Sequence, residues 1–241
     1  MAEELPPDRD VRYARQQLIP GWQQRQIADA SLLVVGAGAI GNEVLKNLAL
    51  LGVGHLVIVD MDRIEHSNLS RTVLFHDHDV GQSKAATAAR AVQRLNPDVR
   101  VTVLEGDLRF GLGLGYVRHS TLVLGCLDNQ GARSWLSRMC LAANVPLLDA
   151  GMWAWGGEIR AFLSPDEACF DCLLSPDERA DLWLRFSCTA GFRPVDAAPH
   201  LPTTISTTAI IGGLLVQEAV RFLHQQPMES GTALVYNGQA C

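Results

Sequence analysis

Several features are missing from this sequence, and each absence argues against one class of protein or partner. It has no apolar run of membrane-spanning length and no basic stretch followed by an apolar segment near Met1, so we expect a cytoplasmic protein without a membrane partner. It has no basic excess, because 20 lysines and arginines stand against 26 acidic residues, for a net charge of -6. Proteins that bind nucleic acid through its phosphates usually carry a basic balance, so nucleic acid is not an expected partner.

The sequence also has few cysteines for a disulfide-stapled protein, since only six occur in 241 residues. In an intracellular chain of this length they are better interpreted as core thiols, metal ligands or nucleophiles. Cys169 and Cys172 have the CxxC spacing that supplies half of a structural zinc site. The other four are Cys126, Cys140, Cys188 and Cys241.

The composition that is present is typical of a globular α/β protein. Hydrophobic residues make up 48% and charged residues 19% of the chain, which is an ordinary soluble composition. The length suits one domain with a substantial core. We therefore expect a disordered N-terminus over residues 1–10, which is polar and contains prolines, and a single domain over residues 11–241.

A strand, a glycine turn and a helix are expected in succession between Ser31 and Leu51. Residues 32–35 are a continuous apolar run, and the turn after it carries Gly36, Gly38 and Gly41. In a dinucleotide-binding unit these glycines permit the tight turn, the approach of the backbone to a phosphate, and the close packing of the helix. The N-terminus of the helix after the turn favours an anion. The pattern predicts a phosphate site.

Polar residues after the next strand indicate which nucleotide is bound. Asp60 ends the apolar run and stands where an acidic residue can bind a ribose hydroxyl. Asp62, Asn68, Arg71 and Lys84 come next, and two cations and an amide at this edge suit a triphosphate. Lys84 falls in the first turn of a predicted helix, where a cation opposes the helix dipole, so it makes better sense as a phosphate ligand.

Hydrophobic periodicity and turn residues predict the remaining elements. The sequence predicts two short helices within 12–30, a helix at 84–95 capped by Ser83, and helices at 132–143 and 209–223. Further strands are expected at 99–104, 121–124, 146–149, 158–163 and 233–236. The fold class is therefore α/β with a Rossmann-like, mostly parallel sheet.

Three stretches resemble one known family. They are GAGAIGNEVLKNLALLG, VDMDRIEHSNLSRTVLF and QSKAATAARAVQRLNP. They are similar to the adenylation domain of the ubiquitin-activating (E1-like) enzymes and of their bacterial relatives, the ThiF, MoeB and HesA proteins. The resemblance extends, more weakly, over residues 12–238. It implies an ATP-binding N-terminal half and a C-terminal half that binds a carrier protein.

Asp128 and Asn129 come after the predicted strand at 121–124, at the sheet edge where Asp60 and the glycine turn also lie. A carboxylate facing a triphosphate needs a hard divalent cation between the two, so Asp128 is assigned to Mg²⁺. The resemblance agrees, because the family's Asp-Asn pair at this place is metal-binding and catalytic. Asp128 could also cap the next helix.

The resemblance also gives Arg15 a role. The segment RYARQ is similar to the opening RYxRQ of the family, in which an arginine reaches across a dimer interface to the partner's ATP. Arg15 is the matching residue, which implies a homodimer. The alternative is a surface arginine on an N-terminal helix.

In the second half, the family resemblance bears on the cysteines. Relatives complete the zinc site with a second CxxC near the C-terminus, which this sequence lacks, so the site is absent here or takes Cys188, Cys241 or His200 as further ligands. Cys188 also precedes Thr-Ala-Gly, as in the ThiF stretch whose cysteine links covalently to the activated carrier. A thiolate could convert an acyl-adenylate into a thioester. Otherwise Cys188 is a spectator thiol.

Trp153 and Trp155 lie between glycines in the same half and are either a contact surface or packing residues. The helix at 209–223 resembles the family's late core helix, and Gly212 and Gly213 would allow it to pack closely.

These observations together predict an adenylyltransferase. The expected reaction is ATP-dependent adenylation of the C-terminal glycine of a ubiquitin-like β-grasp carrier, followed in one version by a thioester on Cys188. An E2-like conjugating enzyme or a sulfurtransferase would be a further partner. The alternatives are an NAD-dependent Rossmann oxidoreductase and an inactive scaffold subunit of a heterodimeric activating enzyme. The intact set of site residues speaks against the scaffold.

Overall fold

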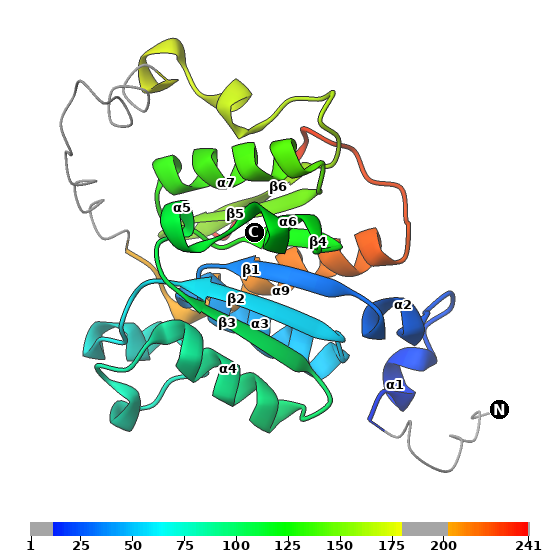
Figure 1. Ribbon diagram of the computed structural model, residues 1–241, viewed down its shortest axis with the longest axis vertical. Helices are drawn as coiled ribbons and strands as arrows, with labels where there is room; N and C mark the ends of the chain where they lie inside the picture. The colour runs from blue at the N-terminus through cyan, green and yellow to red at the C-terminus, as the bar shows by residue number, and fades with distance from the viewer. Residues whose placement is uncertain (1–11, 180–201, 241) are drawn as a thin grey trace.

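A seven-stranded sheet runs through the protein, with helices on both of its faces (Figure 1). The structure is a computed structural model that describes residues 12–179 and 202–240. Within these residues the strand order is β3-β2-β1-β4-β5-β6-β7. The first five strands in this order pair in parallel, and β6 and β7 join antiparallel at one edge. The expected mostly parallel sheet is confirmed.

The strands are β1 (Ser31–Val35), β2 (His55–Asp60), β3 (Arg100–Glu105), β4 (Leu122–Gly125), β5 (Leu147–Trp153), β6 (Gly156–Phe162) and β7 (Ala233–Asn237). The longer helices are α3 (Ala39–Leu51), α4 (Lys84–Leu95), α7 (Gln130–Ala143) and α9 (Ile205–Leu223). Short helices are α1 (Ala14–Gln17), α2 (Gln24–Ala28), α5 (Leu108–Gly111) and α6 (Leu114–Arg118). Short 3-10 helices are η1 (His66–Arg71), η2 (Asp77–Asp79) and η3 (Phe170–Leu173).

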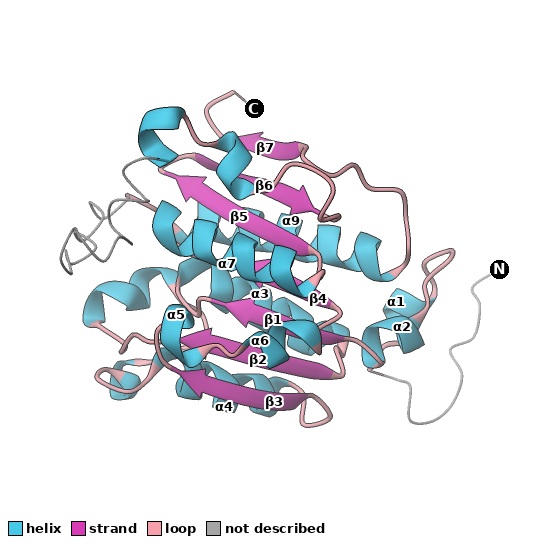
Figure 2. Cartoon of the chain, turned by 45° about the horizontal axis from the view of Figure 1, so that its top comes forward, coloured by secondary structure: helices cyan, strands magenta, loops and turns pink. Residues whose placement is uncertain are grey.

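The described residues form two hydrophobic cores on opposite faces of the sheet, and Figure 2 shows the helical layers on either side. Alternate residues of β1 point to different cores: Leu32 and Val34 pack with α3, α4 and α9, whereas Leu33 and Val35 pack on the side of α7. A strand buried on both faces must be apolar throughout, which is why the central strands are continuous hydrophobic runs. The parallel strands therefore form a rigid frame for the loops at their ends.

The structure differs most from the expected boundaries at two places, and α7 and β6 each also begin two residues earlier than expected. Helix α9 begins at Ile205 rather than at 209, because the side chain of Thr204 accepts a hydrogen bond from the Thr207 amide and caps the helix there. Strand β5 runs past Asp149 to Trp153, since its second half pairs with β6 in a hairpin that β5 could not form alone. None of the described helices is long and apolar enough to cross a bilayer.

Candidate active site

The glycine turn is shaped by close contacts between β1, α3 and the end of β4. Gly36 has a φ of 96°, and a Cβ there would lie 2.5 Å from the carbonyl oxygen of Cys126. A Cβ on Gly41 would overlap the carbonyl of Gly36. Gly38 differs, because nothing lies within 4 Å of the position its Cβ would take. Two glycines thus allow backbone packing, and the third leaves open space beside the first turn of α3.

Buried Asn42 ties this turn to the segment after Arg71, and sequence reasoning missed it. Its side-chain amide donates to the carbonyl oxygens of Ala37 (2.7 Å) and Gly38 (3.1 Å), and its oxygen accepts from the Leu74 amide at 2.9 Å. Asn42 is fully buried. A polar residue in the first turn of α3, directly after the glycine turn, was the available signal.

Asp60 lies against the glycine turn, as expected of a residue at the end of β2. One carboxylate oxygen accepts from the Ala37 amide at 2.6 Å and the other from the Asp62 amide at 2.8 Å. Burial raises the pKa of Asp60, while these amides and Lys84 act in the opposite direction. Each carboxylate oxygen can accept a second hydrogen bond, so Asp60 keeps acceptor capacity toward a hydroxyl.

Lys84 and Asp62 form an ion pair beside Asp60. The Lys84 ammonium lies 2.8 Å from the Asp62 carboxylate, and the Lys84 amide donates to the Asp62 carbonyl at 3.0 Å. Lys84 is the first residue of α4 and Ser83 caps that helix, so both sequence predictions are confirmed. The lysine side chain is only 12% exposed, whereas that of Asp62 is 53% exposed. The cation is therefore held in place near the ends of β1 and β2.

Arg71 and Asn68 lie on η1, apart from this pair. The Arg71 guanidinium donates to the Ser67 carbonyl at 2.6 Å. The Asn68 side chain accepts from the Glu65 amide at 3.0 Å and so caps η1. In the described residues Arg71 has no acidic partner within ion-pair distance.

Asp128 lies just beyond β4, the strand beside β1. The chain leaves β1 toward β2 and leaves β4 toward β5, so the two connections diverge and open a crevice at the carboxyl ends of the strands. Asp128 is exposed there, and its carboxylate accepts from the Asn129 side chain at 3.2 Å. The expected cap is wrong by one residue: Asn129 has the extended backbone of an N-cap, and its oxygen accepts from the Ala132 amide at 2.8 Å.

A buried ion pair next to this loop was also missed. Arg133, in the first turn of α7, lies 2.7 Å from the Asp149 carboxylate of β5. The guanidinium also donates to the carbonyl oxygens of Leu127 and Ala150, each at 2.7 Å. Burial raises the pKa of Asp149 to about 6, against the lowering effect of Arg133. The sequence signal for this pair was Asp149 itself, an acidic residue directly after the apolar residues that begin β5.

Arg15 lies away from these residues within its own chain. It is exposed on α1, and the neighbouring Gln16 donates to the carbonyl of Leu51, the last residue of α3. Helix α3 begins at the glycine turn, so α1 lies at the other end of the strands, near their amino ends (Figure 1). The 13 residues of α3 correspond to about 20 Å.

Cys169 and Cys172 face each other with their sulfur atoms 3.7 Å apart. In residues 12–179 and 202–240, no three His, Cys, Asp or Glu side chains gather into a metal-binding group. Cys188, Cys241 and His200 lie outside the described residues, so a zinc site and a Cys188 nucleophile stay predictions. Burial raises the pKa of Cys140 to about 12 and that of Cys126 further.

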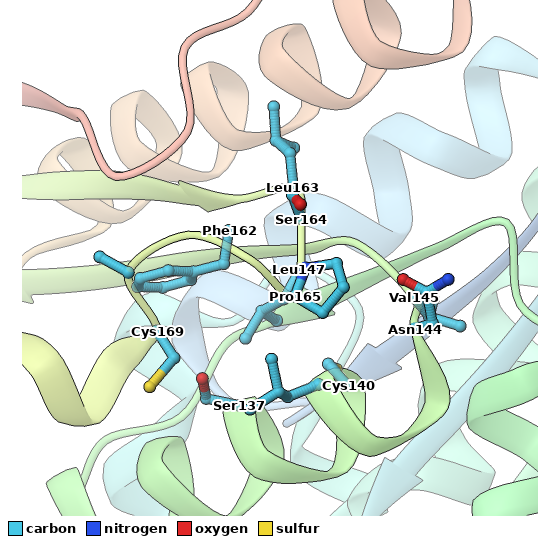
Figure 3. Close-up of a pocket in the computed structure, with 12 residues that line it drawn as sticks. Ser137, Cys140, Asn144, Val145, Leu147, Phe162, Leu163, Ser164, Pro165 and Cys169 are labelled. Carbon is cyan, nitrogen blue, oxygen red and sulfur yellow. The ribbon is translucent and has the colours of Figure 1, made fainter.

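A separate pocket lies between α7 and the segment after β6 (Figure 3). Ser137 and Cys140 of α7 line it together with Pro165 and Cys169. None of the nucleotide-site residues predicted from the sequence borders it. The pocket therefore plays no part in the candidate active site.

The C-terminal half presents exposed apolar side chains. Trp155 is 56% exposed, Trp153 39%, Val235 57% and Leu234 43%. Trp153 ends β5 and Trp155 lies in the turn to β6, and the Gly238 amide donates to the Trp155 carbonyl at 2.8 Å. Neither tryptophan is a buried packing residue.

The fold matches that of known structures. A crystal structure of Escherichia coli MccB with ATP superimposes with a TM-score of 0.73 at 20% sequence identity, covering 96% of this chain and 69% of that one. A structure of PaaA gives the same TM-score and identity, covering 99% of this chain and 82% of that one. Likeness at this identity concerns the fold alone.

Sequence comparison gives more similar relatives. The molybdopterin-synthase adenylyltransferase of E. coli is 32% identical over 244 residues, covering 99% of this chain and 92% of the relative. The E. coli sulfur carrier protein ThiS adenylyltransferase is 29% identical, covering 97% and 89%. The SUMO-activating enzyme subunit uba-2 of Caenorhabditis elegans is 36% identical over 162 residues, but this chain spans only 28% of its length. The profile of the ThiF family matches residues 12–240, and the chain therefore belongs to the ThiF family.

Proposed function

We propose that this protein adenylates the C-terminal glycine of a ubiquitin-like β-grasp carrier, using ATP. The observation that carries the proposal is that the glycine turn, Asp60, the Lys84–Asp62 pair and Asp128 all belong to the loops and helix starts that follow the carboxyl ends of β1, β2 and β4. Relatives that this chain matches over nearly its whole length are named adenylyltransferases, one of them acting on the sulfur carrier protein ThiS. The family match favours this function over an NAD-dependent oxidoreductase.

The residues present fit ATP. The open space at Gly38 lies at the start of α3, where free amides favour a phosphate. Lys84 and Arg71 supply positive charge toward the phosphates, and Asp62 holds Lys84 in place. Asp60 accepts hydrogen bonds from the ribose, while Asn68 and Asn129 hold the loops on either side of the nucleotide.

In the proposed reaction an oxygen of the carrier's terminal carboxylate attacks the α-phosphorus of ATP. The bond from the α-phosphorus to the bridging oxygen breaks, pyrophosphate leaves, and the carrier becomes an acyl-adenylate. Two anions must approach each other, so the contribution of Lys84 and Arg71 is mainly charge neutralisation and alignment. No proton needs to be removed from the carboxylate at neutral pH.

Asp128 fits a magnesium ion better than a structural role. Its carboxylate is exposed at the crevice, and Asn129 has taken over the helix cap. Mg²⁺ in nucleotide sites is commonly held by one or two carboxylates together with phosphate oxygens, so one aspartate is enough. When bound, Mg²⁺ neutralises charge on the phosphates.

Arg15 completes the site from a second subunit in this proposal. Its position near the amino ends of the strands keeps it from its own site at their carboxyl ends, so the arginine that serves the phosphates would come from a partner subunit. The active form is then a homodimer. We place the reaction in the cytoplasm, and the exposed tryptophans of the C-terminal half on the carrier side.

The test is carrier-dependent exchange of labelled pyrophosphate into ATP, with carriers of the ThiS, molybdopterin-synthase and SUMO types tried in turn. Asp128→Ala should lower the rate at least about a thousandfold with an unchanged melting temperature. Asp98→Ala is the matched control, because Asp98 is also exposed but lies just before β3, at the amino ends of the strands. Near wild-type exchange by Asp128→Ala would remove the metal assignment. A wild-type protein that is active only with an added homologue would instead support a scaffold subunit.

A second step after adenylation is proposed separately. Cys126 and Cys140 are buried, neutral thiols, and Cys169 and Cys172 are the expected zinc ligands. That leaves Cys188, or else Cys241, as the nucleophile that would take the acyl group from AMP as a thioester. Carrier and Mg·ATP should then give a thiol-sensitive adduct that Cys188→Ala lacks, while pyrophosphate exchange continues. Accumulation of carrier-AMP without any adduct would mean direct transfer to a sulfurtransferase or an E2-like enzyme.

A further inference from the structure

Arg133 makes an unusual number of contacts for one side chain. It lies in the first turn of α7, and its guanidinium donates to the Leu127 carbonyl from two nitrogens, at 2.7 and 3.2 Å. The same group reaches the Ala150 carbonyl at 2.7 Å and the Asp149 carboxylate at 2.7 Å. One side chain thus joins the loop after β4 to strand β5.

The surrounding backbone is shaped to accept this pair. A Cβ on Gly125 would overlap the Asp149 carboxylate, and a Cβ on Gly151 would lie 3.0 Å from the Arg133 guanidinium. The Asp149 side chain is 1% exposed and that of Arg133 is 13% exposed. In the part of the chain that is described, one oxygen of Asp149 has no hydrogen-bond partner. A buried ion pair of this kind is a poor source of stability, so another role is expected.

The loop that Arg133 holds carries Asp128. The Cys126 amide donates to the Val35 carbonyl at 2.8 Å, the Leu127 carbonyl accepts from Arg133, and the Asn129 side chain caps α7. The exposed Asp128 carboxylate itself accepts only from the adjacent Asn129 among the contacts described. Its direction is therefore set by the backbone on either side of it.

We propose that Arg133 is a positioning residue that fixes the Leu127 carbonyl and so aims the Asp128 carboxylate into the nucleotide crevice. The catalytic part of this inference rests on the proposed function. A planar guanidinium can hold three acceptors at once in a fixed geometry, and a lysine ammonium cannot reproduce that fork. Arg133 itself does not touch the substrate.

The experiment compares Arg133→Lys with Arg138→Lys. Arg138 is on the same helix and pairs with Asp171 at 2.7 Å, and that partner belongs to η3 rather than to the Asp128 loop, so it is a matched control. The first readout is hydrogen–deuterium exchange of the peptide covering residues 125–132 in the free protein. Arg133→Lys should speed exchange there at least about fivefold, and Arg138→Lys should leave it unchanged.

The second readout is the split between kcat and KM in pyrophosphate exchange. Arg133→Lys should lower kcat about 10- to 100-fold while KM for ATP changes less than about threefold, because the phosphate ligands are untouched. In an Asp128→Ala background, Arg133→Lys should add almost no further loss, since both changes remove the same interaction. Full additivity would overturn the inference.

Asp149→Asn distinguishes the contribution of the carbonyl contacts of Arg133 from that of its ion pair with Asp149. It is close in shape and leaves both carbonyl contacts of Arg133 in place, so loop exchange should stay within about twofold of wild type. Loosening equal to that of Arg133→Lys would assign the anchoring to the ion pair and overturn the inference. An unchanged rate of hydrogen–deuterium exchange in the loop of Arg133→Lys would also overturn the inference. A fall in the Tm of this variant by more than about 10 °C would overturn it too, because Arg133 would then be required for the fold itself. If the wild type shows no pyrophosphate exchange, only the proposed function fails. Hydrogen–deuterium exchange of the loop would still decide whether Arg133 positions it.

Discussion

The two halves of the sheet differ in how much of each strand is covered. In β1 and β4 nearly every side chain is buried, whereas four of the five residues of β7 are exposed. The parallel strands lie between two helical layers, but β7 is an antiparallel edge strand. The first arrangement holds loop residues rigidly at strand ends, and the second leaves a surface. This contrast suits a protein that fixes a small anionic ligand in one half and meets a macromolecule with the other.

Asp149 and α9 join the two halves. Asp149 lies on β5, the last parallel strand, and α9 packs on both α3 and β5. Substitutions can therefore test three properties: whether the ligand-holding half is complete in one chain, how the joint behaves, and whether the open half is a binding surface.

The largest effect is expected from mixing two inactive variants, which tests whether one chain holds a complete site. Arg15→Ala and Asp128→Ala should each lose at least about a thousandfold in pyrophosphate exchange. Random exchange of subunits makes half of the dimers mixed. If Arg15 acts in trans, each mixed dimer has one intact site, so about a quarter of normal activity should return. No recovery in this mixture would place Arg15 outside the partner's site.

A mixture of Asp128→Ala with Lys84→Ala is the control. If Lys84 and Asp128 serve the same site of one chain, as their positions at the ends of neighbouring strands suggest, every site in every dimer keeps one defect and no activity returns. Recovery is expected there only if Lys84 acts in trans. Recovery in the control but not in the Arg15 mixture would reverse the assignment of the two cations.

The joint between the halves should be pH-sensitive. Burial raises the pKa of Asp149 from 3.8 to about 6, opposed by Arg133 and Arg160 and reinforced by Glu158. The folded state then holds this proton more tightly than the unfolded chain. The stability from Asp149 is therefore full below its unfolded pKa and lost as pH rises through about 6.

Relative to Asp149→Asn, the unfolding free energy of the wild type should fall by on the order of 2 kcal/mol between pH 4 and pH 7. Denaturant titrations of both proteins across this range measure the difference, and the neutral variant cancels the contribution of other groups. A difference that stays flat would mean that Arg133 offsets the burial of Asp149 completely.

Two adjacent glycines on α9 should respond in opposite directions. A Cβ on Gly212 would lie 2.5 Å from the Cβ of Glu43 on α3, whereas nothing lies within 4 Å at Gly213. Gly212→Ala should destabilise the protein by about 1–3 kcal/mol through overpacking. Gly213→Ala should stabilise it by about 0.5–1 kcal/mol, because alanine is the better helix former. Melting temperatures of the pair decide this. If Gly212→Ala stabilised the protein, α9 and α3 would be able to move apart at this contact at little cost in free energy.

Local patterns in the sequence predicted most of the first half, because apolar runs and caps act over a few residues. The glycine turn and the Ser83 cap are of this kind. The Asn129 cap was missed because neighbouring Asp128 could serve equally, and only the backbone conformation chooses between them. The contact between Arg133 and Asp149 joins the first turn of α7, which follows β4, to strand β5, so it depends on the pairing of β4 with β5.

Short elements were missed for another reason. Helices α5 and α6 lie in a glycine-rich segment that has no helical periodicity, and they are stabilised by burial of Leu108 and Val117 against α7. Isolated helices of this length do not form in water, so their existence depends on packing. The roles of site residues toward ATP and carrier came from the family resemblance, and they stay predictions.

The smallest effect is expected at Trp155, which tests whether the open half is a binding surface. The side chain is 56% exposed on the β5–β6 turn, and the hydrogen bond from Gly238 holds its backbone in place. A large aromatic group presented on a rigid turn is typical of an interface anchor. Trp155→Ser should raise KM for the carrier about tenfold, while KM for ATP stays the same and stability changes by less than about 0.5 kcal/mol. Phe110→Ser is the control, because Phe110 is 78% exposed on α5, the helix after β3, and β3 lies at the other edge of the sheet from β7. Equal effects of both substitutions, or an effect of Trp155→Ser on stability alone, would show that this tryptophan serves packing and that the carrier binds elsewhere.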